Sequence, residues 1–285
     1  MSTDNPSPVV ETKAILIMAV LAALAMLVSG QQTAMEWHHA ALVVSGLGKY
    51  DEAILAYDEA IKLDPNDATI WHNKASTLTT LGRYDEAIEA YDEALRLYPE
   101  YAAAWLGKGN ALMYLGKYDE AVKAYDEAIR CDYGMRSAWV NRDIALSQLA
   151  FAEGHTFFEQ GEYDEAIQAL DEAIRLNSEN VDAWNNKGLA LALMGNYTEA
   201  IACFDEAIRL HPDAAMVWAN KGEALVTLGN YEEAIQACDE AIRLDPEYAD
   251  AWYQKGVALE AFGRTSEADE AYAKAQELEL GGGLY

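Results

Sequence analysis

The chain has 285 residues, of which 52% are hydrophobic, and its 48 acidic side chains against 20 basic ones leave a net charge of −28. This balance argues against nucleic-acid binding, which depends on Lys and Arg neutralising phosphates, whereas an acidic surface favours solubility and basic partners. Three cysteines (Cys131, Cys203 and Cys238) are too few and too scattered for a disulfide framework or a metal site. We therefore expect these cysteines to be buried and to pack as small hydrophobic residues.

The N-terminal segment has two parts. Residues 1–13 are mostly small or polar and include two prolines, so we expect them to be disordered. Residues 14–28 then follow without a polar side chain, and with two more small residues the segment 14–30 has about 17 residues, the short end of the range for a membrane-spanning helix.

Three interpretations of residues 14–30 remain open. We favour a single-pass membrane anchor. A signal peptide that is cleaved and leaves a secreted protein is the first alternative, and a helix packed on the first repeat as a cap is the second. Lys13 precedes the run and no Lys or Arg follows it until Lys49, which favours an extracytoplasmic position for the rest of the chain.

Tryptophan marks an internal repeat. Trp37, Trp71, Trp105 and Trp139 lie 34 residues apart, as do Trp184, Trp218 and Trp252, whereas Trp139 and Trp184 are separated by 34 plus 11 residues. A fixed period of this length indicates a repeat architecture. The predicted repeats span 34–67, 68–101, 102–135, 136–180, 181–214, 215–248 and 249–282, and we expect a flexible tail at 283–285.

Each repeat is predicted to form two antiparallel helices. In the first, Trp71 is followed four residues later by Ala75 and three further by Leu78, a spacing that places all three on one helix face. Gly82 then suits a left-handed helix end. The acidic pair Asp85–Glu86 suits the positive start of the next helix.

The second helix of each repeat alternates small and large apolar residues. Ala87, Tyr91 and Ala94 recur at intervals of four and three, which allows close helix packing. Asp92 and Arg96 are four residues apart, as are their counterparts in other repeats, so we expect salt bridges within this helix.

The pattern W-x3-G/A-x2-L-x3-G-x-Y-x2-A-x3-Y-x2-A-x4-P resembles the tetratricopeptide repeat family and covers about 34–282. The resemblance implies an all-α solenoid of antiparallel helix pairs that winds into a right-handed superhelix. It also implies that the first helix of each repeat lines a concave groove and that the partner is a protein or a peptide.

The eleven extra residues lie between Trp139 and Gly161. Eleven residues make about three helical turns, which returns the apolar face to its original side. Because 136–160 contains no proline, we predict one extended helix there. The helix contains an unusual cluster, for which we favour a space-filling role over a partner-binding site: Phe151, His155, Phe157 and Phe158.

The residues that follow each tryptophan are the candidate groove, because the family resemblance places them there. A row of side-chain amides can donate to and accept from the backbone of an extended peptide, although solvated amides would give the same pattern. The candidate partner-binding residues are Asn73, Asn110, Asn141, Asn185, Asn186, Asn220, Glu223, Tyr253 and Gln254.

No motif predicts catalysis or a cofactor. His38 and His72 occupy the same repeat position, but two imidazoles without a third ligand are weak evidence for a metal, and we expect ordinary groove residues. The family members that clamp terminal carboxylates need Lys directly after tryptophan, where this chain has none, so an acidic tail is not the expected ligand. The orientation of the lysines three after most tryptophans decides whether they reach the groove.

The sequence therefore predicts a non-enzymatic scaffold or adaptor, tethered to a membrane through residues 14–30, that binds a protein or peptide in its first-helix groove. A structural protein that associates with itself and has no separate client is the alternative. The sequence leaves the oligomeric state and the identity of the partner open.

Overall fold

The computed structural model describes residues 33–281. The segments predicted to be disordered (1–13), membrane-anchoring or cleaved (14–30) and flexible (283–285) lie outside these residues. Within the described part, no helix is both long and apolar enough to span a bilayer.

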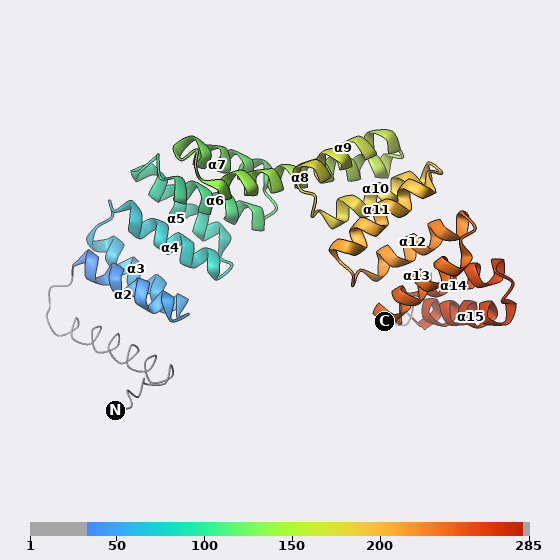
Figure 1. The fold of residues 1–285 in the computed structure, drawn as a ribbon. Helices are drawn as coiled ribbons and strands as arrows, with labels where there is room; N and C mark the ends of the chain where they lie inside the picture. The colour runs from blue at the N-terminus through green and yellow to red at the C-terminus, as the bar shows by residue number, and fades with distance from the viewer. Residues whose placement is uncertain (1–32, 282–285) are drawn as a thin grey trace, which may run out of the picture. The chain divides into compact units, whose positions relative to one another are not determined.

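Paired α-helices make up the described chain, as predicted, and Figure 1 shows them following one another in chain order. The first helix of each pair begins three residues before the tryptophan. The first helices are α2 (Ala34–Gly46), α4 (Ala68–Thr80), α6 (Ala102–Tyr114), α8 (Arg136–Gln160), α10 (Val181–Leu193), α12 (Ala215–Thr227) and α14 (Ala249–Ala261). The second helices are α3 (Tyr50–Leu63), α5 (Tyr84–Leu97), α7 (Tyr118–Cys131), α9 (Tyr163–Leu176), α11 (Tyr197–Leu210), α13 (Tyr231–Leu244) and α15 (Thr265–Gly281). The chain is thus an all-α solenoid.

Glycine ends the first helix of each pair in the left-handed conformation, as the sequence predicted. At Gly82 the backbone φ is 77°. The next amide, Arg83 N, reaches back to Leu78 O at 3.0 Å, which satisfies a carbonyl that the helix end would leave unpaired. Asp85 and Glu86 then lie in the first turn of α5, where carboxylates stabilise the positive helix end.

The chain divides after Ala145, inside α8, into two compact units. We call them unit 1, which includes α2 to α7, and unit 2, which includes α9 to α15. Their cores consist mainly of alanines and one large side chain from each second helix, such as Tyr125 in unit 1 and Phe204 in unit 2. A glycine in the partner helix makes room, because a Cβ at Gly188 would lie 2.5 Å from the Phe204 ring.

Tryptophan, a basic residue three positions later and an aspartate of the preceding second helix join neighbouring pairs of helices; the basic residue is lysine except at Arg142. The indole of Trp218 donates to Pro212 O at 2.9 Å in the loop before α12. Lys221 Nζ lies 5.6 Å from the Trp218 ring centre and 2.6 Å from an oxygen of Asp205, on the preceding second helix. This lysine position is therefore occupied by a tertiary contact.

The salt bridges predicted between residues four apart in the second helices are wrong. Arg96 pairs with Glu93, three residues earlier, at 2.8 Å. Asp92 is instead drawn to Lys108 of the following first helix at 2.6 Å. Lys108 of the next repeat therefore takes the place of Arg96 as the partner of Asp92, and the periodicity of a single helix does not show such a contact.

The extended helix predicted over 136–160 is confirmed as α8. Its later part repeats the packing of a first helix, with Ala150 eleven residues after Trp139 and Gly154 facing the second helix α9. A Cβ at Gly154 would lie 2.9 Å from Leu170, sixteen residues later, the same separation as between Gly188 and its partner. The eleven residues thus preserve the face of the helix.

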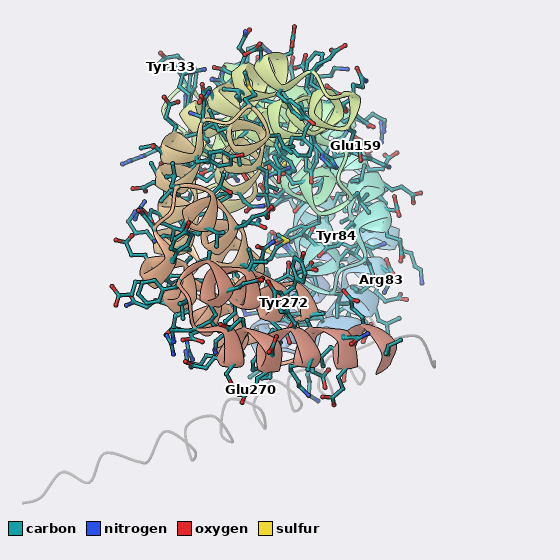
Figure 2. All side chains as sticks on the ribbon, turned by 90° about the vertical axis from the view of Figure 1, so that its right-hand side faces the viewer. Arg83, Tyr84, Tyr133, Glu159, Glu270 and Tyr272 are labelled. Atoms are coloured by element: carbon teal, nitrogen blue, oxygen red, sulfur yellow. The ribbon has the colours of Figure 1, made fainter. Side chains whose placement is uncertain are left out.

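The last helix, α15, has a polar outer side. Its residues Asp269 and Gln276 are exposed where other second helices have apolar side chains. In Figure 2, Glu270 points away from the protein and Tyr272 lies toward the rest of unit 2. The Tyr272 hydroxyl donates to Glu260 of α14 at 2.9 Å, which fixes α15 against its partner.

First helices form one face of each unit. Successive first helices contact one another, as α4 and α6 do in unit 1 and α12 and α14 do in unit 2. The second helices within 33–281 contact first helices but not one another. The first helices of each unit therefore lie closer together and form its inner face, which we call the first-helix face.

Candidate partner-binding groove

The first-helix face of unit 1 contains a closed polar network. The hydroxyl of buried Tyr125 donates to Asn110 Oδ1 at 2.9 Å, and Asn141 Nδ2 donates to the same oxygen at 2.8 Å. Burial raises the pKa of the Tyr125 hydroxyl, so it stays a hydrogen-bond donor. Asn141 keeps its carbonyl oxygen and one N–H for another partner.

A cavity of about 470 Å³ opens above this network. Three successive first helices and one second helix line it, which places it across the stack rather than along one helix. We call it the unit-1 cavity. Its walls are Thr79, Asn110, Met113, Tyr114, Tyr125, Asn141 and Ile144.

Histidines occupy the first-helix face nearer the start of unit 1. His38 Nε2 lies 2.8 Å from Asn73 Nδ2, so this ring nitrogen accepts from the amide. Burial lowers the pKa of both His38 and His72, which favours neutral rings. The His72 ring lies 4.8 Å from that of Tyr101 in a tilted arrangement, and its buried Nδ1 has no hydrogen-bond partner among the described residues.

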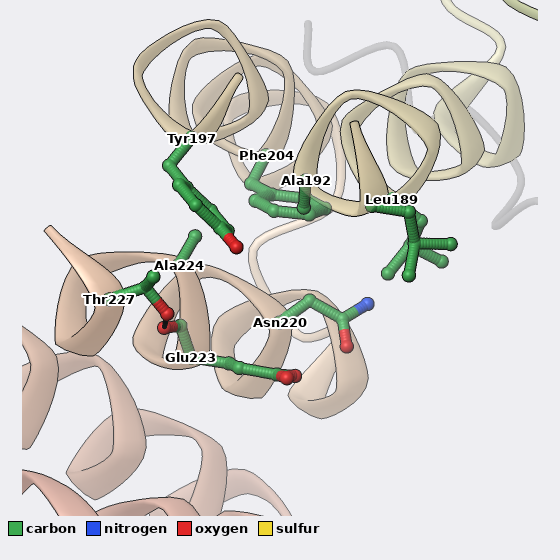
Figure 3. A pocket seen from close by; sticks show the side chains of 9 residues that line it. Leu189, Ala192, Tyr197, Phe204, Asn220, Glu223, Ala224 and Thr227 are labelled. Carbon is green, nitrogen blue, oxygen red and sulfur yellow. Dashed lines mark hydrogen bonds between the residues drawn. The ribbon is translucent and has the colours of Figure 1, made fainter. Parts of the chain in front are cut away.

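In unit 2 the amides pair differently. Asn220 Nδ2 donates to the side-chain oxygen of buried Asn185 at 3.0 Å. A cavity of about 260 Å³, which we call the unit-2 cavity, lies beside Asn220 between α10, α11 and α12. Figure 3 shows its walls: Leu189, Ala192, Leu193, Tyr197, Phe204, Asn220, Glu223, Ala224 and Thr227.

The two cavities occupy the same position in the repeat. The floor of each is the side chain twenty residues after a tryptophan, and the facing wall comes from the second and fifth residues after the next tryptophan. Asn141 and Asn220 are equivalent and chemically alike. Other lining positions differ. Tyr125 corresponds to Phe204, Asn110 to Leu189, Ile144 to Glu223, Met113 to Ala192 and Tyr114 to Leu193.

The lysines three residues after tryptophan do not add positive charge to the first-helix face. Lys187 binds Asp171 at 2.5 Å, and Lys255 binds Asp239 at 2.7 Å, as Lys221 binds its own aspartate. Each of them also lies over its own tryptophan ring. The question that the sequence left open is thereby answered: these lysines hold neighbouring helix pairs together.

The remaining candidate groove residues lie outside both cavities. Asn186 and Gln254 are partly exposed. Tyr253 is 51% exposed, and its ring lies 5.6 Å from that of Tyr272. Their role in binding stays a prediction.

The aromatic cluster of α8 separates into different contacts. Phe151 packs on the core that includes Leu170, which agrees with a space-filling role for this ring. His155 is exposed and stacks on Phe151 at 6.3 Å. Phe158 meets Tyr163 edge-on at 5.6 Å, and Phe157 is partly buried. Partner binding by this cluster stays a prediction.

Several cavity residues were not among the sequence candidates. Thr79 and Met113 lie eight residues after their tryptophans, and Leu189 and Ile144 lie five after theirs. The repeat alignment contained this signal, because these positions vary in chemistry while the core positions around them do not. Within residues 33–281 no three His, Cys, Asp or Glu side chains are grouped to hold a metal ion.

Comparison with protein families matches a tetratricopeptide repeat model to five overlapping stretches, which together cover most of the chain. The matched residues are 40–102, 72–136, 151–215, 194–249 and 220–279. No curated protein matches the chain as a relative.

Several solved structures are similar. The crystal structure of MamA is 24% identical, with a TM-score of 0.44, and the match covers 62% of this chain and 97% of that one. YrrB, described as a tetratricopeptide repeat protein with an unusual peptide-binding site, is 26% identical with a TM-score of 0.42. The match covers 70% of this chain and 97% of YrrB. A tetratricopeptide repeat protein from Parabacteroides merdae is 17% identical with a TM-score of 0.46, and the match covers 87% of this chain and 94% of that one. At these TM-scores the likenesses do not bear on what this chain binds.

Proposed function

Because the chain belongs to the tetratricopeptide repeat family, we propose that it is a non-enzymatic adaptor whose first-helix face binds an extended segment of a partner protein. The observation that supports this most is the occurrence of a cavity at the same repeat position in both units. An amide with unused hydrogen-bonding capacity stands at each cavity, Asn141 in unit 1 and Asn220 in unit 2.

An extended peptide suits this arrangement. Its side chains enter cavities, and its backbone amides pair with asparagine side chains, which both donate and accept. The face is preformed, because the network of Tyr125, Asn110 and Asn141 already fixes the side chains of its floor. A preformed groove avoids part of the ordering cost of binding.

Photo-crosslinking tests this proposal. A benzoylphenylalanine placed at Thr227, exposed at the unit-2 cavity, should crosslink to a discrete partner in cells of the source organism. The matched control is the same group at Gln236, which is exposed on the second helix α13. Equal crosslinking from the two positions, or none from Thr227, would contradict binding at the first-helix face.

We further propose that residues 14–30 tether the chain to a membrane, on the strength of their unbroken apolar sequence. The alternative, secretion after cleavage, predicts a mature N-terminus near residue 31. N-terminal sequencing of the protein from membrane and soluble fractions separates the two. An intact N-terminus on membrane-bound protein supports the anchor, whereas a shortened soluble chain excludes it.

A further inference from the structure

The unit-2 cavity combines apolar walls with a single carboxylate. Leu189, Leu193 and Phe204 supply carbon surface, and Glu223 stands on the opposite wall (Figure 3). At about 260 Å³ the cavity is smaller than the roughly 300–1,000 Å³ typical of small-molecule sites, which suits one side chain.

The charge of Glu223 is not neutralised by a neighbouring base. Among residues 33–281 no Lys or Arg forms an ion pair with Glu223. The lysines of the two first helices that line the cavity, Lys187 of α10 and Lys221 of α12, are bound to Asp171 and Asp205. The carboxylate acts at a distance on Tyr248. Burial first, and then nearby carboxylates that include Glu223, raise the pKa of that hydroxyl.

Other exposed carboxylates lie on the first helices of unit 2, although Glu223 is the one that lines the cavity. Asp182, Asp250 and Glu260 are all exposed, and the chain as a whole has a net charge of −28. An anionic side chain would be repelled here. A cationic one would be attracted over the length of the screening distance, about 8 Å at physiological salt.

The equivalent cavity in unit 1 lacks this charge. Ile144 occupies the place of Glu223, and the hydroxyl of Tyr125 is already bound to Asn110. The cavities differ at several equivalent positions, but only the change from Ile144 to Glu223 adds a charge. This change therefore points to different side chains at two places along a partner.

We propose that the unit-2 cavity holds a lysine or arginine side chain of an extended partner segment, with its cationic end at Glu223 and its aliphatic stem along Leu189 and Leu193. Long cationic side chains bury their stems on apolar surface while the charge stays near water, and Glu223 is itself exposed to water. Asn220, which uses only one N–H on Asn185, can bind the partner backbone next to that residue. The inference rests on the proposed function and adds the chemistry of the partner.

Selection from a phage-displayed library of dodecapeptides against the purified full chain tests the inference. A selected peptide is synthesised with its basic residue and with norleucine in that place, which keeps the stem and removes the charge. Each is titrated against the wild type, Glu223→Gln and Glu232→Gln. Glu232 is an exposed carboxylate on the second helix α13, so its variant makes the same change in net charge away from the cavity.

We expect selected peptides to share a Lys or Arg at one position. Glu223→Gln should weaken the lysine peptide about fivefold and leave the norleucine peptide within about twofold, while Glu232→Gln changes neither beyond about twofold. Peptides that bind without a basic residue, or that are insensitive to Glu223→Gln, overturn this inference but leave the proposed function standing. If no peptide binds, the proposed function fails as well.

Discussion

Units 1 and 2 use the same repeat with different side chains beneath their first-helix faces. In unit 1 the large residue of each second helix is a tyrosine, and Tyr57, Tyr91 and Tyr125 are all buried. The corresponding residues at the start of unit 2 are Leu170, Phe204 and Cys238. Unit 1 therefore has hydroxyl groups beneath a neutral face, whereas unit 2 has an apolar floor beneath an acidic face.

This comparison separates what the repeat requires from what it leaves free. Both units need a bulky or apolar group opposite the small residue of the first helix, and tyrosine, phenylalanine and leucine all meet that need. The hydroxyl and the fifth residue after tryptophan are not needed for packing. Differences at those positions are therefore where the two units can acquire different partners.

The largest expected effect concerns what the units share. Trp218→Ala and Trp105→Ala should each lower the free energy of unfolding by about 3–5 kcal/mol, since both remove a large ring that packs on the core and donates to a loop carbonyl. Urea unfolding followed by circular dichroism measures this. Trp218→Phe, which loses the hydrogen bond but keeps a ring, should cost less. A large loss in only one unit would show that the junctions are not equivalent.

Iodoacetamide should modify the cysteine of unit 1 about 100-fold or more faster than the two cysteines of unit 2. Burial raises the pKa of Cys203 to about 11 and that of Cys238 to about 12, so at pH 8 almost no thiolate forms in unit 2. Cys131 of unit 1 is partly exposed. Iodoacetamide should modify Cys131 first and the other two only in urea. Fast labelling that persists in Cys131→Ser would contradict the burial of the unit-2 thiols.

A smaller effect should follow when the floors are exchanged. Phe204→Tyr places a hydroxyl beside Leu189, where unit 1 has Asn110, and an unpaired buried hydroxyl costs about 1–3 kcal/mol. Adding Leu189→Asn should recover part of that loss. The reciprocal change Tyr125→Phe should cost about 1 kcal/mol, since one hydrogen bond is lost. Denaturation of the single and double variants measures the coupling, and additive costs would refute it.

The smallest effect is a transfer of charge preference. Ile144→Glu gives the unit-1 cavity the carboxylate of unit 2, and we expect it to strengthen binding of a lysine peptide about threefold in a Glu223→Gln background. The gain should disappear at high salt, because an exposed ion pair contributes only about 0.2–1 kcal/mol. Fluorescence anisotropy at two salt concentrations measures it. A gain that salt does not alter would show that charge is not the cause.

Most of the fold could be predicted from the sequence, because the determinants are local and recur. Gly82 and its counterparts mark the end of each first helix, and tryptophan marks its beginning. The absence of proline from 136–160 and the length of eleven residues predicted α8. Each of these signals involves residues close together in the chain, so periodicity was enough.

The candidate site was only partly predictable. The amides after tryptophan were visible, but which of them pair with each other depends on neighbouring repeats, as with Asn141 and Asn110. The predicted pairing of Asp92 with Arg96 was wrong for the same reason, since Lys108 comes from the next repeat. Contacts between repeats have to be seen in three dimensions.

The length of the insertion in α8 determines which side chains of the helix face α9. At 100° per residue, eleven residues complete about three turns with roughly 20° to spare, so Gly154 faces α9 as a first-helix glycine must. One residue more or fewer between Trp139 and Gly154 would turn that glycine away by about 100° and bring a side chain onto Leu170. Insertions in this helix are therefore tolerated only when their length is close to a whole number of helical turns. Insertions in the exposed loops between helices do not have this restriction.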